Sequence, residues 1–420
     1  MIAVPFIYFS ILSLVLYFRR GKRIDFSVII STIFAISGLF SILVDAFGLR
    51  NSDTENYSIS FLASFSYCAL ITVCLLPFVR YSNLTITTIR PLRKSALLKM
   101  FAVLSILWFL TMVYFSLDTF IIMLTSNMGE ARIRVYAGDV ESSLNNIPAV
   151  MRPIMILFNS IFKCSWVLIF LAFFSRFVQR LPVIYFWLYF LSSLSGPYNS
   201  VIGADRSAVA YWVLTALGVY HLFIPVINKK EKRSLVKGGV IIIFLLGVYL
   251  IMMTISRFSE SGLFGGDDSA TQGSLIYYFG ISYINFCNFF DNYTPPFSDF
   301  GILFPFTTQF ILGIKTGATL IQERMTLATG FECGTFYTFI GQIIMGAGKF
   351  VAIVFCFLYS FFSFIVLPST TNRSGARIHD LYMYFMLVTV LYLGLFVYYY
   401  TSPYITFSVF FFYFLLRLSK

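Results

Sequence analysis

Charged residues are scarce in this chain. Asp, Glu, Lys and Arg make up 11% of its 420 residues, whereas 59% are hydrophobic, and the mean hydropathy is +0.84. These values exclude an ordinary soluble domain and are typical of integral membrane proteins. The net charge of +12 would favour nucleic acid as the partner of a soluble protein, but here the basic residues lie in short connectors between apolar runs. We therefore expect no nucleic-acid partner.

Several chemical motifs are missing as well. The sequence has no Walker A loop, no dinucleotide-binding glycine pattern, no HExxH helix and no Asp-rich metal pair. We expect neither a cofactor nor a metal, and ATP-driven transport loses support. The six cysteines have no CxxC spacing, and four of them lie inside apolar segments. Cys287 and Cys333 lie in the region assigned to the outer side, where a disulfide is chemically feasible although no spacing rule supports it.

The apolar runs are long enough to cross a bilayer, which needs about 20 residues per helix. Eleven of them recur at 3–18, 26–47, 59–79, 100–123, 153–174, 181–196, 207–227, 238–256, 348–367, 381–400 and 403–417. The sequence therefore predicts an all-α, polytopic integral membrane protein with about 11 transmembrane helices. The range is 10 to 12, because Ser402 and Pro403 separate two aromatic runs that can be divided differently. The first run has no basic residue before it, so we expect no cleaved signal peptide.

Charge separates by side when these runs are taken as spans. The connectors 19–23, 80–99, 175–180, 228–237 and 369–380 are basic, and their side receives about two thirds of the 30 Lys and Arg residues but only 3 of the 18 acidic ones. The positive-inside rule assigns this side to the cytoplasm. The amino terminus is then outside, the carboxyl terminus is inside, and we expect the functional site on the outer face.

One connector, 257–332, is much longer than a connection needs to be, and such loops are usually functional or disordered. It is rich in aromatic residues, and its polar residues recur at a spacing that predicts a helix lying on or dipping into the membrane with one wet face: Ser282, Asn285, Asn288 and Asp291. The run 302–320 predicts a second interfacial or re-entrant helix, and 335–348 predicts a short outer helix that leads into the next span.

The chain thus divides by topology into three parts. Residues 1–256 hold the amino-terminal transmembrane helices, 257–347 form a large external loop in the carboxyl-terminal half, and 348–420 hold the last helices.

Charged side chains at membrane depth are costly unless paired or hydrated, so each marks a candidate functional position. Arg206, where one span begins, and Arg257, at the outer end of the next, are placed to bind a phosphate or pyrophosphate. The alternative for Arg206 is a local ion pair with Asp205. Arg132 and Arg134 are too close in sequence to share a helical face, so we expect one of them to face the site.

Two further kinds of charged residue need an explanation. Lys163 is isolated in the middle of a span, which implies a partner or a water-filled cavity and makes it a candidate for structure more than for chemistry. A general base on the outer face must be a carboxylate, because both histidines lie toward the inner side. Glu332, Asp291 and Asp205 are the candidates, since they lie nearest to apolar surroundings, although each has a common alternative role in capping or ion pairing.

Three short stretches add to this architecture. They are GADRS at 203–207, YYFG at 277–280 with the run to Asp291, and GFECGTFY at 330–337 followed by Gly341 and Gly346. Together with the many spans and the single large outer loop, they resemble the bacterial oligosaccharide repeat-unit polymerases, the Wzy-type O-antigen and capsule polymerases. Phe339 stands where many relatives carry Asp, so the resemblance supplies no catalytic acid at that position.

The resemblance implies a metal-independent glycosyltransferase of the bacterial inner (plasma) membrane. It would transfer a growing glycan from undecaprenyl pyrophosphate to a sugar hydroxyl of a new lipid-linked repeat unit on the periplasmic side. Its partners would be the undecaprenyl-pyrophosphate-linked oligosaccharide and membrane lipid, and a chain-length regulator is a candidate protein partner.

The resemblance also implies roles for the candidate residues. The pyrophosphate would be bound by Arg206 and Arg257, with Arg132 or Arg134 as a third cation. The base would be Glu332 or Asp291, with Asp205 as a further candidate. The sugar faces would be covered by loop tyrosines, namely Tyr278, Tyr283 and Tyr337.

Three alternatives remain at this level. A flippase for lipid-linked repeat units would line a central cavity with charges, whereas here the charges gather at one face. A ligase that moves finished polysaccharide shares the architecture, and the absence of an outer histidine weighs against it. A structural subunit of the export machinery gives no reason for arginines at membrane depth.

Overall fold

The structure is a computed structural model, and it describes residues 1–51, 53–93, 95–125, 147–202, 207–261, 269–296, 300–313, 318–331, 333, 337–371 and 375–419. These residues are mostly helical and include no β-strand, which confirms the predicted all-α fold. Each of the eleven predicted runs contains a helix. Among the described residues, five helices are long and apolar enough to cross a membrane, or six if one bent pair is a single span. The membrane character is thus supported, and a count of about 11 spans stays a prediction.

By packing, the chain forms two compact units. Unit 1 comprises Met1–Ile86, Gln272–Ala376 and Met383–Thr406, and unit 2 comprises Thr87–Thr271, Arg377–Tyr382 and Phe407–Lys420. Each unit draws on stretches that are distant in sequence. Packing therefore groups the chain differently from the division by topology at residues 256 and 347.

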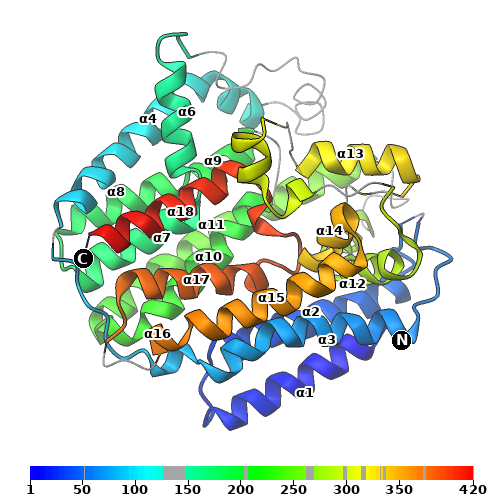
Figure 1. Cartoon of the computed structure of the whole chain (residues 1–420). Coiled ribbons are helices and arrows are strands. Elements are labelled where there is room, and N and C mark those ends of the chain that lie inside the picture. The colour runs from blue at the N-terminus through cyan, green and yellow to red at the C-terminus, as the bar shows by residue number, and fades with distance from the viewer. Residues whose placement is uncertain are drawn as a thin grey trace. The chain divides into compact units, whose positions relative to one another are not determined.

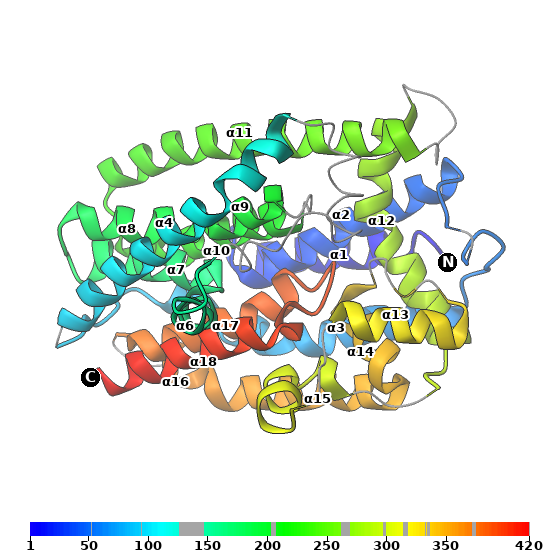
Figure 2. The same cartoon turned by 90° about the horizontal axis from the view of Figure 1, so that it is seen from above.

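Unit 1 is built around four helices that lie side by side in Figures 1 and 2. These are α1 (Val4–Arg19), α2 (Phe26–Ala46), α3 (Phe61–Arg80) and α15 (Lys349–Val366). The unit also contains η1 (Asn83–Thr85), most of α12 (Ser269–Asn292), η4 (Phe300–Ile302), η5 (Thr307–Ile311), α13 (Ala318–Thr329), α14 (Thr338–Ala347), α16 (Pro368–Thr371), most of α17 (Ile378–Tyr392) and η6 (Tyr399–Thr401).

Unit 2 packs around α7 (Ser165–Phe173), whose residues are all buried. Its other elements are α4 (Ala96–Thr125), α6 (Arg152–Phe162), η2 (Phe174–Val178), α8 (Val183–Ser193), α9 (Ser195–Ile202), α10 (Ser207–Phe223), η3 (Ile224–Val226), α11 (Lys229–Ser261) and most of α18 (Pro403–Leu418). The predicted span 153–174 is not one straight helix, because α6 and α7 meet at a bend of 64°.

Local sequence explains where two helices of unit 1 begin. Asp25 precedes α2 and accepts a hydrogen bond from the backbone N of Val28 at 3.0 Å, and Ser60 precedes α3 and accepts one from Ala63 N at 3.0 Å. These are the side chains that satisfy free N–H groups at a helix start. Basic residues occupy the last turns of α1 and α3, where they interact favourably with the helix dipole.

The helix α12 crosses α2 at very short range. A Cβ atom on Gly280 would lie 2.4 Å from the backbone O of Phe40, so only glycine fits there. At the same crossing, Ser37 Oγ donates to Phe279 O at 2.8 Å and Ser41 Oγ donates to Gly280 O at 2.7 Å. Small residues that bring two backbones together, with hydroxyl groups between them, are a typical way for helices to associate in apolar surroundings.

The long loop differs from its predicted helices in one place. The run 302–320 is not a single helix, since it contains the end of η4, the short η5 and the start of α13, and Gly313 has a φ of +68° that ends a helix. The short helix predicted at 335–348 is confirmed as α14, which Gly348, with a φ of +87°, connects directly to α15.

Replacing Gly280 with leucine should destabilise unit 1, because the side chain would collide with the backbone of α2. We expect a loss of about 1–3 kcal/mol, the usual cost of overpacking, measured as a lower thermal unfolding midpoint in detergent. The matched control is Gly247→Leu in α11, where a Cβ meets nothing within 4 Å. Equal midpoints for the two variants would contradict the close crossing.

Candidate functional site

The polar face of α12 meets the connection between α2 and α3. Ser282, Asn285 and Asn288 are at most 3% exposed, so the predicted wet face is wrong and this face is buried up to Asp291, which is partly exposed. The reason is that the connection lies over it: Asn288 Nδ2 donates to Asp53 O at 3.1 Å, and Asn51 Nδ2 donates to Asn285 Oδ1 at 3.5 Å. The amides of α12 thus bind protein groups in place of water.

Asp291 lies at the carboxyl end of the same face and receives two hydroxyl groups. Tyr57 OH donates to Oδ2 at 2.5 Å, and Ser60 Oγ donates to Oδ1 at 2.9 Å. Ser60 is also the residue that caps α3, so the start of that helix fixes one of the two donors. The structure therefore brings one predicted catalytic carboxylate together with two hydroxyls from a distant part of the sequence.

Lys349 is a neighbour that the sequence reasoning missed. Its Nζ donates to the backbone O of Asp291 at 3.4 Å and lies 5.5 Å from the centre of the Phe290 ring. The signal was present in the sequence, since Lys349 is the basic residue that follows Gly348 at the predicted outer end of a span. It places a positive charge beside the carboxylate-bearing turn.

Tyr57 is held in place through its own backbone. Arg50 Nη1 donates to Tyr57 O at 2.5 Å and to Thr54 O at 3.1 Å, and Arg50 Nη2 pairs with Asp45 Oδ1 at 2.6 Å. Burial raises the pKa of Tyr57 above its ordinary value, and the hydrogen bond to Asp291 raises it further. The phenol therefore stays protonated at neutral pH and remains a hydrogen-bond donor to the carboxylate.

This arrangement, which we call the Asp291 site, consists of Tyr57, Ser60, Asp291 and Lys349. A carboxylate that binds two hydroxyl groups can bind a substrate hydroxyl in place of one of them and take its proton. The ammonium group adds a cation that favours an anionic ligand. Within the described ranges, no group of three His, Cys, Asp or Glu side chains is placed to hold a metal ion.

Most of the other predicted site residues lie outside the described residues. These are Asp205, Arg206, Arg132, Arg134 and Glu332. Arg257 is part of α11, and the structure describes its backbone but not its side chain. The proposed arginine clamp therefore stays a prediction.

The three loop tyrosines occupy different environments. Tyr283 is fully buried, and its OH donates to Ser64 Oγ at 2.9 Å. Tyr337 is 3% exposed, with its ring centre 4.3 Å from that of Phe289. Both rings support the packing of unit 1. Tyr278 keeps part of its surface exposed, which a ring that stacks on a sugar needs.

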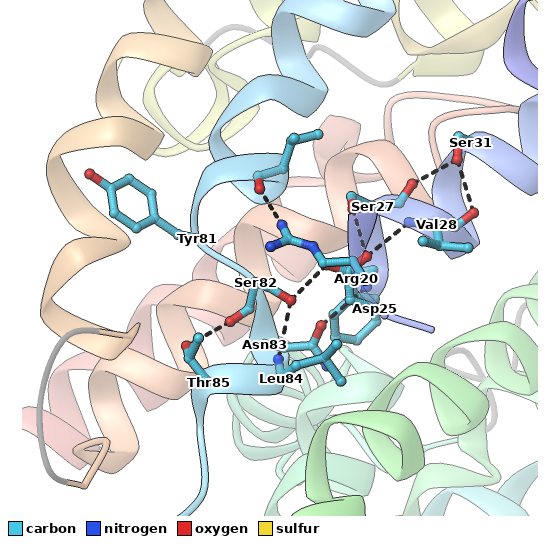
Figure 3. Close-up of polar contacts among 12 residues, drawn as sticks. Arg20, Asp25, Ser27, Val28, Ser31, Tyr81, Ser82, Asn83, Leu84 and Thr85 are labelled. Carbon is cyan, nitrogen blue, oxygen red and sulfur yellow. Dashed lines mark hydrogen bonds and ion pairs between the residues drawn. The ribbon is translucent and has the colours of Figure 1, made fainter. Parts of the chain in front are cut away.

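A second polar cluster of unit 1 lies at the opposite ends of α2 and α3 (Figure 3). The fully buried carboxylate of Asp25 has Oδ2 2.9 Å from Arg20 Nε and 2.6 Å from Ser82 Oγ, and its Oδ1 accepts from Ser27 Oγ at 2.6 Å and Val28 N at 3.0 Å. Both oxygens are fully occupied, so the cluster joins the α1–α2 connection to the end of α3. The sequence reasoning did not single out Asp25, although an acidic residue between a basic run and an apolar run signals a helix cap.

The two cysteines of the outer region form no disulfide. Cys287 and Cys333 are both free and buried. Burial raises the pKa of the Cys333 thiol to about 11.

Comparison with protein-family models, curated proteins and solved structures found no match.

Removing the Asp25 carboxylate should leave Arg20 without its counter-charge in a largely buried position. We expect Asp25→Ala to lower the free energy of unfolding by about 3–5 kcal/mol, as breaking a buried ion pair does, measured by denaturant unfolding in micelles. The control is Asp45→Ala, which breaks an ion pair whose acidic side chain is 41% exposed and should cost about 1 kcal/mol or less. A smaller loss for Asp25→Ala than for Asp45→Ala would overturn the structural role of this cluster.

Cys333 should react slowly with iodoacetamide in the folded protein. Because the thiol is protonated below a pKa of about 11, its reactive thiolate is only about 0.1% of the total at pH 8. Labelling followed by peptide mass spectrometry should become about tenfold faster per pH unit up to that pKa. Unfolded protein, whose thiols have a pKa of about 8.5, is the reference. Equal rates for folded and unfolded protein at pH 8 would contradict the burial of this thiol.

Proposed function

We propose that the chain is a membrane glycosyltransferase that polymerises undecaprenyl-pyrophosphate-linked oligosaccharide repeat units into O-antigen or capsular polysaccharide. The reaction would take place on the periplasmic face of the bacterial inner membrane. The proposal combines the all-helical membrane character of the described chain with the charge separation between connectors and the resemblance to the Wzy-type polymerases.

The observation that carries the proposal is the Asp291 site. Glycosyl transfer to a sugar hydroxyl needs a base for the hydroxyl proton, and Asp291 is a partly exposed carboxylate whose oxygens already bind two hydroxyl groups. It lies on the long loop helix, at the ends of α3 and α15 that the charge pattern assigns to the outer side. A lipid-linked acceptor would reach it from the membrane.

In the proposed reaction, the Asp291 carboxylate acts as the general base. An acceptor hydroxyl replaces Ser60 or Tyr57 at Asp291, its oxygen attacks the anomeric carbon of the donor glycan, and its proton passes to the carboxylate. The bond between that carbon and the pyrophosphate oxygen breaks, and the electron pair leaves with undecaprenyl pyrophosphate. Arg206 and Arg257 would stabilise the negative charge of the leaving group.

A specific test is the polysaccharide pattern of cells in which this gene is deleted and replaced by the Asp291→Asn variant. The amount of variant protein in the membrane is matched to that of wild type. We expect a single repeat unit in place of a ladder, and a rate on purified lipid-linked repeat units at least about 100-fold lower, since general bases contribute that much. Tyr57→Phe should slow the reaction less, because the carboxylate remains.

The matched control is Glu323→Gln, which neutralises an exposed carboxylate on α13 of the same loop and should leave the ladder unchanged. A normal ladder with Asp291→Asn would remove Asp291 from the reaction. If loss of the gene abolishes even the single-unit product, flipping of lipid-linked repeat units becomes the better function.

A further inference from the structure

The break between α6 and α7 exposes backbone that a continuous helix would satisfy. Cys164, between the two helices, has extended dihedral angles, with φ of −85° and ψ of 99°. The carbonyl of Ile161, which loses its helical partner there, accepts a hydrogen bond from Ser408 Oγ at 2.5 Å. In membrane proteins, a helix broken in this way is tolerated where the break is buried in protein or lines a cavity. Such breaks also form the substrate and ion sites of transporters.

A cavity of about 110 Å³ lies at this break. Its walls are formed chiefly by Trp108, Met112, Met155, Asn159, Lys163 and Asn199, which come from α4, α6, α9 and the break itself. The space is many times that needed for one water molecule, so it also admits a group of phosphate size. The lining combines apolar side chains with one ammonium group and two amides.

Among the described residues, these polar groups have no side-chain partner. None of Asn159, Lys163 and Asn199 forms a side-chain hydrogen bond or ion pair within the part of the chain that the structure describes. Lys163 lies deep in unit 2, and it keeps some accessible surface because it lines the cavity. A desolvated ammonium group without a counter-charge is strongly unfavourable, and an anion in the cavity would remove this cost.

The start of α7 adds to the positive electrostatic potential at the break. This helix begins at Ser165, two residues after Lys163, and the positive end of its dipole therefore lies at the break. A helix start, a lysine ammonium and two amide groups are the donors that proteins use for phosphate oxygens. Because a phosphate group has several acceptor oxygens, it can bind all of them at once.

We propose that this cavity, the Lys163 cavity, binds an oxyanion of the phosphate class. Two sources carry this chemistry: the pyrophosphate of a polyprenyl lipid and a free phosphate or pyrophosphate ion. The lipid source rests on the proposed function. Anion binding by the Lys163 cavity does not depend on that function, because its support is the break, the cavity and the three polar side chains.

The test uses the whole chain in detergent with two probes, inorganic pyrophosphate and undecaprenyl pyrophosphate. Undecaprenol, the same lipid without phosphate, is the control. Each probe is titrated while the thermal unfolding midpoint and direct binding are measured. Binding of a phosphate probe should raise the thermal unfolding midpoint of wild type and of Lys163→Arg, which keeps the charge. Lys163→Met should bind about 10- to 100-fold more weakly, the loss expected for hydrogen bonds to a charged group.

Without any probe, Lys163→Met should unfold at the same temperature as wild type or at a higher one, because it removes an unpaired buried charge. Lys99→Met, which removes an exposed lysine at the start of α4, is the control and should bind like wild type. If Lys163→Met does not fold, Asn199→Asp serves instead: its carboxylate would pair with Lys163, preserve the fold and exclude the anion.

The two probes separate the sources. A response to the lipid but not to the inorganic ion assigns the headgroup, the reverse assigns the free ion, and a response to both supports the shared chemistry. No response of wild type to either probe, or an equal response of Lys163→Met, overturns the proposal. Asp291→Asn should bind both probes normally, so a failure of the proposed function remains distinguishable from a failure of this one.

Discussion

The structure depends on one constraint: a polar group in apolar surroundings must find its partner within the chain. Asp25 meets it with three hydrogen-bond donors and one ion pair around its carboxylate. The amides on α12 meet it through the connection that covers them. The carbonyl freed at the break in unit 2 meets it through Ser408. These contacts join segments far apart in sequence, and so they decide which helices pack together.

The same constraint distinguishes structural clusters from candidate sites. Around Asp25, every acceptor position is filled by a group that belongs to the fold, and replacing one would cost stability. Asp291 also binds two donors, but it is partly exposed and both donors are hydroxyls, which a substrate hydroxyl can replace. In the Lys163 cavity, the described residues supply no counter-charge at all. Function is expected where the protein leaves such groups incompletely satisfied.

The sequence predicted Asp291 and Lys163 as positions of interest for sound reasons. A carboxylate on an aromatic loop helix and a lone lysine in an apolar run both carry a cost that needs an explanation. The partners could not be predicted, because Tyr57 and Ser60 lie more than two hundred residues from Asp291 and nothing in their local pattern indicates that contact. The missed neighbour Lys349 shows the same limit, since its charge was visible and its position beside Asp291 was not.

The sequence by itself determined the all-α class, the eleven apolar segments and most helix boundaries, because hydrophobic length and capping residues act locally. Only the tertiary structure decided that the polar face of α12 is buried, since a wet face and a face covered by another segment have the same spacing in sequence. It also decided that the span 153–174 breaks at Lys163. No proline or glycine marks that break, and Ser408 and the surrounding helices stabilise it through long-range contacts.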